Sequence, residues 1–199
     1  MEETKTSLKS NVVELMQSVV IAIALCVFIY LFLATPNQID GQSMDPTFKH
    51  GEIVLTSKVH QWLGSTPFGK TLQLDYQRGD IVVFQKPGFN DFIKRVIALP
   101  GDTIQIKDGK VLVNSIQLNE DYLDASIFTK GGSFIDENDQ PKVLGQDQYF
   151  LMGDNRSNSH DSRYVDIGFV KREWLKGKVL IIYWPLNRFW LVQHANLLE

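Results

Sequence analysis

The chain has 199 residues, of which 44% are hydrophobic and 22% are charged. This length suits one medium domain, or one small domain plus a membrane anchor. With 20 Lys and Arg against 23 Asp and Glu, the composition argues against a nucleic-acid-binding protein and against a disordered acidic chain. A single cysteine excludes an internal disulfide framework. The scattered histidines lack metal-ligand spacing, so we expect no metal and no other cofactor.

An uncharged apolar stretch over residues 18–34 lies near the N-terminus. A helix rises about 1.5 Å per residue, so about 20 residues cross the ~30 Å hydrocarbon core. The stretch therefore predicts a membrane anchor over residues 12–34. A buried core helix and a cleavable signal peptide are the alternatives. The apolar region of a signal peptide is usually only about 7–15 residues long, and here Pro36 would follow the cleavage site.

The lysines near this stretch predict its orientation. Lys5 and Lys9 precede it, and the first basic residue after it is Lys49. The positive-inside bias then makes residues 1–11 a short cytoplasmic tail and places the remaining chain on the extracytoplasmic face.

The remaining chain predicts a mainly β, mostly antiparallel catalytic domain. Short β-branched and aromatic runs are bounded by Gly, Pro and Asp, and the Asp108-Gly109 pair between alternating arms predicts a hairpin. Residues 171–176 suggest one helical turn. We expect a β core from residues 35–102 and 146–199, and a small hairpin and loop subdomain from residues 103–145. The expected strands include residues 53–55, 81–84, 149–152 and 179–184.

Three segments carry residues that could perform chemistry. In the first, Gly41 and Pro46 predict a tight bend that could expose Ser43 as a nucleophile. A turn serine bonded to its own backbone is the structural alternative.

In the second segment, a strand over residues 92–98 would place Phe92, Lys94, Val96 and Ala98 on one face. Apolar neighbours would lower the pKa of Lys94, because burial disfavours the ammonium form. An edge-strand lysine that prevents aggregation is the structural alternative.

The third segment, residues 153–163, consists almost wholly of Gly, Asp, Asn, Ser and Arg. It predicts either a rigid polar scaffold or a mobile surface loop. His160 in this loop suggests a Ser-His-Asp triad with Ser43, although no supporting constellation surrounds the histidine.

Together these segments resemble the type I signal peptidases, membrane-bound serine proteases that use a Ser–Lys dyad. The resemblance is carried by an S-M-x-P-T box at Ser43, a K-R-V-x-x-x-P-G-D box at Lys94, and a G-D-N-R-x-N-S-x-D-S-R box ending at Arg163. All three occur in the family's order behind one anchor. The single span and short middle region resemble the Gram-positive form.

The resemblance implies a role for each matching residue. Ser43 would be the nucleophile, its backbone N–H would contribute to the oxyanion hole, and Lys94 would be the general base. Ser159 would orient the lysine amine. Many Gram-negative members carry a hydroxyl donor two residues before the nucleophile, where this chain has Gly41. Four further residues would form the scaffold of the site: Arg95, Asp154, Asp161 and Arg163.

The resemblance also implies substrates and partners. It predicts an enzyme that removes signal peptides from secreted pre-proteins, cleaving after small residues in an A-x-A pattern through an acyl-enzyme. Pre-proteins, the lipid bilayer and the protein-export machinery are the expected partners, and nucleic acid is not. Two alternatives are a membrane-tethered β-domain that binds partners without catalysis, and a self-cleaving repressor-type protease. The latter would carry a DNA-binding N-terminus in place of the hydrophobic span.

Overall fold

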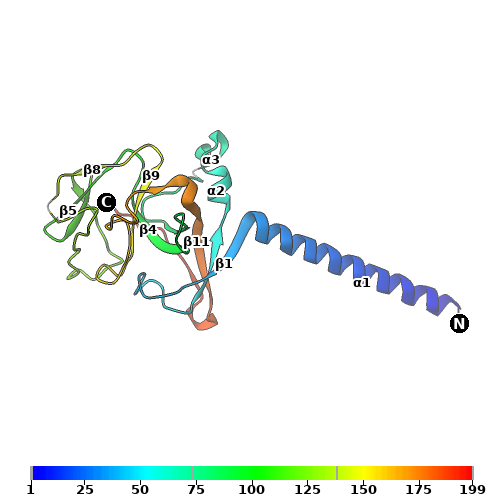
Figure 1. Ribbon diagram of the computed structural model, residues 1–199. Coiled ribbons are helices and arrows are strands. Elements are labelled where there is room, and N and C mark those ends of the chain that lie inside the picture. Colours follow the sequence, from blue (N-terminus) through cyan, green and yellow to red (C-terminus); the bar gives the residue numbers. More distant parts are fainter. Residues whose placement is uncertain (1, 73, 138, 199) are drawn as a thin grey trace.

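The computed structural model describes residues 2–72, 74–137 and 139–198, and Figure 1 shows a long N-terminal helix that projects from a β-rich domain. The elements in chain order are α1 (Glu2–Phe28), the π-helical η1 (Ile29–Leu33), β1 (Ala34–Gln38), β2 (Ile53–Ser57), α2 (Val59–Leu63), α3 (Pro67–Thr71), β3 (Ile81–Phe84), β4 (Phe92–Ala98), β5 (Thr103–Lys107), β6 (Lys110–Val113), β7 (Ile116–Gln117), β8 (Lys142–Val143), β9 (Gln148–Met152), β10 (Val170–Lys171), the 3₁₀ turn η2 (Arg172–Trp174), β11 (Leu175–Trp184), the 3₁₀ turn η3 (Leu186–Arg188) and β12 (Trp190–Leu191).

The N-terminal helix is long and apolar enough to cross a membrane over Asn11–Leu33, with a mean hydropathy of 2.5. None of that window is buried against the rest of the protein. A helix that is apolar on all sides and packs against nothing is typical of a membrane span and not of a soluble core. The structure therefore agrees with an anchor and disfavours the buried core helix.

Two antiparallel sheets form the domain. The larger sheet has eight strands in the order β1-β2-β11-β3-β4-β9-β10, with β12 paired to β11. The smaller has four strands in the order β7-β6-β5-β8. The predicted fold class, a mainly antiparallel β domain behind one N-terminal helix, is confirmed.

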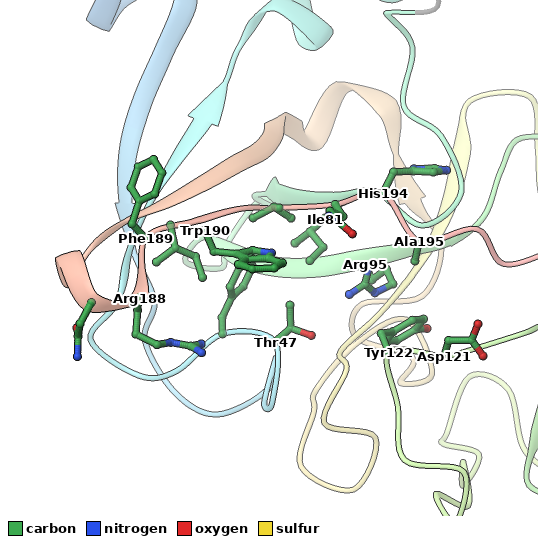
Figure 2. A pocket seen from close by; sticks show the side chains of 15 residues that line it. Thr47, Ile81, Arg95, Asp121, Tyr122, Arg188, Phe189, Trp190, His194 and Ala195 are labelled. Carbon is green, nitrogen blue, oxygen red and sulfur yellow. The ribbon is translucent and has the colours of Figure 1, made fainter.

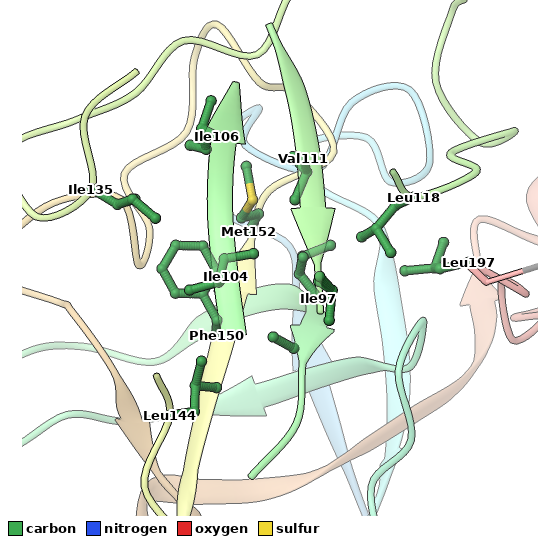
Figure 3. Close-up of a cluster of buried hydrophobic side chains, with 12 residues drawn as sticks. Ile97, Ile104, Ile106, Val111, Leu118, Ile135, Leu144, Phe150, Met152 and Leu197 are labelled. Carbon is green, nitrogen blue, oxygen red and sulfur yellow. The ribbon is translucent and has the colours of Figure 1, made fainter. Parts of the chain in front are cut away.

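The smaller sheet is built within residues 103–143, where the hairpin was expected. Asp108 and Gly109 have φ angles of 50° and 71°, so both turn residues adopt the left-handed conformation that a two-residue hairpin requires. The hydrophobic cluster between the sheets takes Ile104, Ile106 and Val111 from the hairpin, and Phe150 and Met152 from β9 (Figure 3). This cluster fixes β9 and the loop that follows it.

β4 lies between β3 and β9 in the larger sheet, with Val82 opposite Lys94 and Ile81 opposite Arg95. Lys94 and Arg95 therefore point to opposite faces. The prediction that Ala98 shares a face with Lys94 is wrong. A register shift between β4 and β9 after Val96 lets Ala98 pack in the cluster of Figure 3, because a bulge changes the alternation of side chains.

Helices α2 and α3 were not predicted. Each has only five residues, which is too short to show a 3.6-residue hydrophobic period. The helical turn expected within residues 171–176 is present as η2.

Candidate active site

Ser43 lies in a bend between β1 and β2 that is held from both sides. Gly41 has a φ of +88°, a conformation that favours glycine. Met44 is buried in the core. From the other side, Asn155 donates its backbone N–H to the Ser43 carbonyl (3.1 Å) and its side-chain amide to the Gln42 carbonyl (3.0 Å). The loop after β9 thus positions the expected nucleophile.

The expected base meets that nucleophile directly. Lys94 exposes only 2% of its surface, and its Nζ lies 2.7 Å from Ser43 Oγ. The amine also donates to the Ile93 carbonyl at 3.0 Å. A hydroxyl and an amine at this separation have the geometry of a nucleophile and its general base.

The surroundings of Lys94 favour the neutral amine. Burial lowers the pKa of Lys94 to about 8, against the partial opposition of the Asp161 and Asp154 carboxylates, which raise it. Each carboxylate is paired with an arginine, Asp161 with Arg163 and Asp154 with Arg95. Neither is free to form an ion pair with the lysine, so desolvation dominates.

The Ser43 backbone N–H is the expected oxyanion donor. Among residues 2–72, 74–137 and 139–198 it donates to no acceptor, so it is available to a ligand. The Gly41 N–H, in contrast, donates to His50 Nδ1 at 3.1 Å.

Ser159 does not make the predicted contact. Within the described part of the chain, its buried Oγ makes no hydrogen bond to the Lys94 amine, whose partners are Ser43 Oγ and the Ile93 carbonyl. The Ser159 side chain instead contributes to the lowered pKa of Asp161. Ser159 does lie close to the nucleophile. A Cβ added to Gly153 would fall 2.2 Å from Ser159 Oγ and 2.3 Å from the Ser43 carbonyl oxygen, so only glycine allows this approach.

Arg95 and Asp154 form a buried ion pair on the other face of β4. Two guanidinium nitrogens of Arg95 contact the two carboxylate oxygens at 2.8 and 2.6 Å. Thr47 donates to the same carboxylate at 2.6 Å, and Arg95 donates to the Gly79 carbonyl. Because Thr47 follows Ser43 in the same bend, this pair links the bend to β4 and to the loop after β9.

Asp161 and Arg163 form a second buried pair inside that loop. Arg163 Nε lies 2.8 Å from Asp161 Oδ1, and Asp161 Oδ2 accepts from the Gly153 N–H. Burial alone would raise the pKa of Asp161, but the hydrogen bonds and charge of Arg163 lower it below its ordinary value. The loop is therefore the rigid scaffold and not the mobile alternative.

Arg156 and Asn155 belong to the same scaffold, although no sequence pattern distinguishes them from the other polar residues of the loop. Arg156 is buried and donates to the Gly153 carbonyl, and it also contacts Glu120 and the Tyr122 hydroxyl. Those two partners lie outside the loop, so sequence spacing could not reveal the contacts.

A cavity of about 290 Å³ opens beside Ser43 and Lys94. It lies between the segment that enters the bend and the start of β4. Its lining residues are Asn37, Gln38, Ile39, Asp40, Ser43, Met44, Val83, Asp91, Phe92, Ile93, Lys94 and His160.

His160 belongs to this lining but is engaged elsewhere. Its Nε2 lies 2.5 Å from Asp166 Oδ2, and its ring stacks on Tyr164. No hydrogen bond to Ser43 occurs among the described residues, so the geometry favours the lysine over the histidine as the partner of Ser43.

A larger cavity of about 600 Å³ lies on the Arg95 side of the sheet. Figure 2 shows Arg95 beside Tyr122, with Phe189 and Trp190 from the C-terminal segment also lining the space. In this lining the Thr47 and Tyr122 hydroxyls donate to carboxylates that are not free bases, since Asp154 is paired with Arg95 and Glu120 with Arg156. Nor do the described residues contain a group of three or more His, Cys, Asp or Glu side chains that could hold a metal ion.

Comparisons with known proteins place the chain in a family. Residues 12–184 match the family model described as signal peptidase, peptidase S26. The chain is 34% identical over 189 residues to signal peptidase I of Bacillus amyloliquefaciens, covering 94% of this chain and 95% of that protein. It is 36% identical to a probable signal peptidase I-2 of Synechocystis sp., covering 90% and 76%. A crystal structure of a signal peptidase I from Enterococcus faecalis aligns with 29% identity and a TM-score of 0.41, covering 52% of this chain and 96% of that one.

An apolar N-terminal helix followed by a β domain, with a serine hydroxyl in contact with a buried lysine amine, fits the class of membrane-bound serine peptidases. The chain belongs to the signal peptidase family, peptidase S26. The predicted family and the predicted enzyme class, a serine endopeptidase of the signal peptidase I type, are confirmed.

Proposed function

We propose that this protein removes signal peptides from secreted pre-proteins with Ser43 as nucleophile and Lys94 as general base. The observation that carries the proposal is the 2.7 Å contact between Ser43 Oγ and a lysine amine whose pKa burial lowers to about 8. An ordinary lysine, with a pKa of about 10.4, would be neutral in roughly one molecule in a few thousand at pH 7. When burial lowers the pKa to about 8, the neutral fraction of Lys94 at pH 7 rises to roughly one tenth.

Neutral Lys94 accepts the proton as Ser43 Oγ attacks the scissile carbonyl. The oxyanion that forms accepts a hydrogen bond from the Ser43 backbone N–H, a kind of donor worth about 2.7–4 kcal/mol where comparable ones were removed. The Lys94 ammonium then protonates the leaving amine, which departs with the mature chain. Lys94, now neutral again, accepts a proton from a water molecule. That water attacks the ester carbonyl of the acyl-enzyme and releases the signal peptide from Ser43.

The cavity suits an extended peptide with small side chains. β9 pairs with β4 only from Arg95 onward, so within the described residues no strand pairs with Phe92 and Ile93 on that side. A peptide could add to this backbone as an extra strand. Side chains two residues apart in a strand point to the same face. The −1 and −3 side chains of an A-x-A site would therefore both enter the 290 Å³ cavity, which Ile39, Met44 and Ile93 line in part.

The position of the site suits a membrane-bound substrate. Ser43 is nine positions after Ala34, the residue that caps the end of the helix, so the nucleophile lies at most about 30 Å from the end of the span. With the N-terminus in the cytoplasm, the domain lies on the extracytoplasmic face, where the export machinery delivers pre-proteins. Lys5 and Lys9 support this orientation.

The test is cleavage of a pre-protein by the full-length protein in lipid vesicles. Substrates with Ala, Ser or Leu at −1 are compared, and Ser43→Ala is the control for the nucleophile. We expect cleavage after Ala and Ser but not after Leu, and none with Ser43→Ala. Activity that survives Ser43→Ala would refute the nucleophile. Folded protein that binds pre-proteins without cutting them would favour a binding domain.

The acyl-enzyme has a separate readout. Rapid quenching of a slow peptide substrate, followed by mass spectrometry, should show the signal-peptide fragment attached to Ser43 through an ester. Release of both fragments at the same rate, with no ester at any time, would contradict the two-step reaction.

A further inference from the structure

The 290 Å³ cavity beside Ser43 and Lys94 contains a polar side chain to which the proposed chemistry gives no role. Asn37 lines this cavity from β1. Its Oδ1 is buried and, among the described residues, accepts no hydrogen bond. A buried carbonyl oxygen without a partner is less stable than a paired one. The amide of Asn37 is therefore suited to a ligand that supplies the missing hydrogen bond.

The other polar side chains of the cavity lining do not share this property. Two of them, Gln38 and Asp40, are exposed to water. Each of the remaining four belongs to a side-chain pair, and these pairs are Ser43–Lys94, Asp91–Lys176 and His160–Asp166.

The position of Asn37 on β1 relates it to the reacting centre. β1 leads from the N-terminal helix toward the bend of Ser43 (Figure 1), and in the described part of the chain it pairs with β2 and no other strand. The Ile39 N–H donates to the Glu52 carbonyl at 2.8 Å, so this pairing continues to Ile39. Asn37 and Ile39 therefore lie on one face, about 7 Å apart, with Ile39 nearer the bend along the chain.

This spacing equals that of the −1 and −3 side chains in an extended peptide. The −1 carbonyl must lie at Ser43 Oγ for attack to occur. The −3 side chain lies on the same face of the peptide, about 7 Å further from the cleaved bond. When −1 lies beside Ile39, −3 therefore lies beside Asn37.

The chemistry of the amide favours a hydroxyl group at that position. An asparagine amide presents an acceptor oxygen and a donor NH₂ group, and rotation about the last side-chain bond exchanges the two. A Ser or Thr hydroxyl both donates and accepts, so it can pair with either atom. An apolar side chain of the same size would leave the amide unpaired. A longer polar side chain does not suit a cavity of about 290 Å³ that two residues share.

We propose that Asn37 determines specificity at −3, where it favours Ser or Thr over an apolar residue of the same size. This inference rests on the proposed function, because it requires a pre-protein bound beside Ser43. Signal peptides that this enzyme prefers then carry a hydroxyl group at −3 and a small residue at −1.

The test compares Thr with Val, two residues of nearly the same shape that differ by one hydroxyl group. Pre-protein peptides with Ala at −1 carry Thr or Val at −3, and a second pair carries them at −2. The enzymes are the unmodified full-length protein, Asn37→Leu and Asn119→Leu, and kcat/KM is measured for each peptide. Leucine resembles asparagine in shape but has no polar side-chain atom. Asn119→Leu is the matched control, because Asn119 is exposed and lines neither cavity.

We expect the unmodified protein to cleave the −3 Thr peptide with a kcat/KM at least about fivefold higher than that of the −3 Val peptide, as for a hydrogen bond in a desolvated site. In Asn37→Leu this ratio should fall to about one or below, whereas Asn119→Leu should retain it. The −2 side chain points away from the cavity, so the ratio at −2 should stay near one in all three proteins.

A Thr-to-Val ratio near one at −3 in the unmodified protein would overturn the proposal, and so would a preference that persists in Asn37→Leu. In both cases the peptides are still cleaved and Ser43→Ala still abolishes cleavage, so the proposed function survives. Cleavage that withstands Ser43→Ala would instead refute the proposed function, and this inference with it. Should Asn37→Leu fail to fold, Asn37→Ala must remove the preference for Thr.

Discussion

Lys94 and Arg95 are adjacent on β4, and each exposes only 2% of its surface. Arg95 is joined to Asp154 by two hydrogen bonds, and although burial alone would lower the pKa of Arg95, that carboxylate raises it. Lys94 has no carboxylate in direct contact among the described residues, and burial lowers its pKa to about 8. Alternation along one strand thus separates a cation that stabilises the fold from an amine suited to chemistry.

The same substitution at both positions separates the two roles most strongly. Lys94→Met should reduce kcat/KM for pre-protein cleavage by about 10²–10⁴-fold, the usual contribution of a general base. Stability should be unchanged or higher, because an apolar side chain replaces a desolvated amine. Initial rates and urea unfolding in detergent measure both quantities. A Lys94→Met variant that cleaves normally would exclude the lysine as base.

Arg95→Met is the matched variant. It leaves the Asp154 carboxylate buried without its partner, so we expect the free energy of unfolding to fall by about 3–5 kcal/mol. Changing Asp154 to Leu in the same chain should recover part of the loss, because the uncompensated charge is then removed. Urea titration compares the single and double variants. A loss of less than 1 kcal/mol in Arg95→Met (about the median for exposed pairs) would argue that the pair is solvated.

The pH dependence of cleavage should reflect the lowered pKa. The neutral amine is the active form, so kcat/KM should increase with pH through an apparent pKa of about 8 and level off above it. A lysine with its ordinary pKa would move this increase in kcat/KM to a pH of about 10.4. The measurement is a profile of kcat/KM with a peptide that has no ionisable group near the cleaved bond. A limb near 10 would contradict the desolvated site.

The smallest effect is expected at His160, which lines the cavity but is bonded to Asp166. His160→Ala should change kcat/KM by less than about tenfold, or 1.4 kcal/mol, and should leave the pH limb in place. An inactive His160→Ala, compared under the same conditions with Lys94→Met, would favour the histidine triad over the dyad.

Local patterns predicted much of the fold. The apolar stretch identified the anchor, β-branched runs identified strands such as β3 and β9, and Asp108-Gly109 identified the hairpin. These features depend on neighbours in sequence. The short helices α2 and α3 were missed, because five residues contain little more than one helical turn.

The class of protein follows from local sequence features, namely an uncharged span and three ordered motifs that contain Ser43, Lys94 and Asp154. The contacts between these motifs, in contrast, depend on how the chain folds. Ser43 and Lys94 are 51 residues apart and meet through the order of strands in the sheet. The hydrogen bonds of Arg156 to Glu120 and Tyr122 also depend on long-range packing. Sequence spacing does not predict such contacts, because they form only when distant elements pack together and remove water from the groups between them.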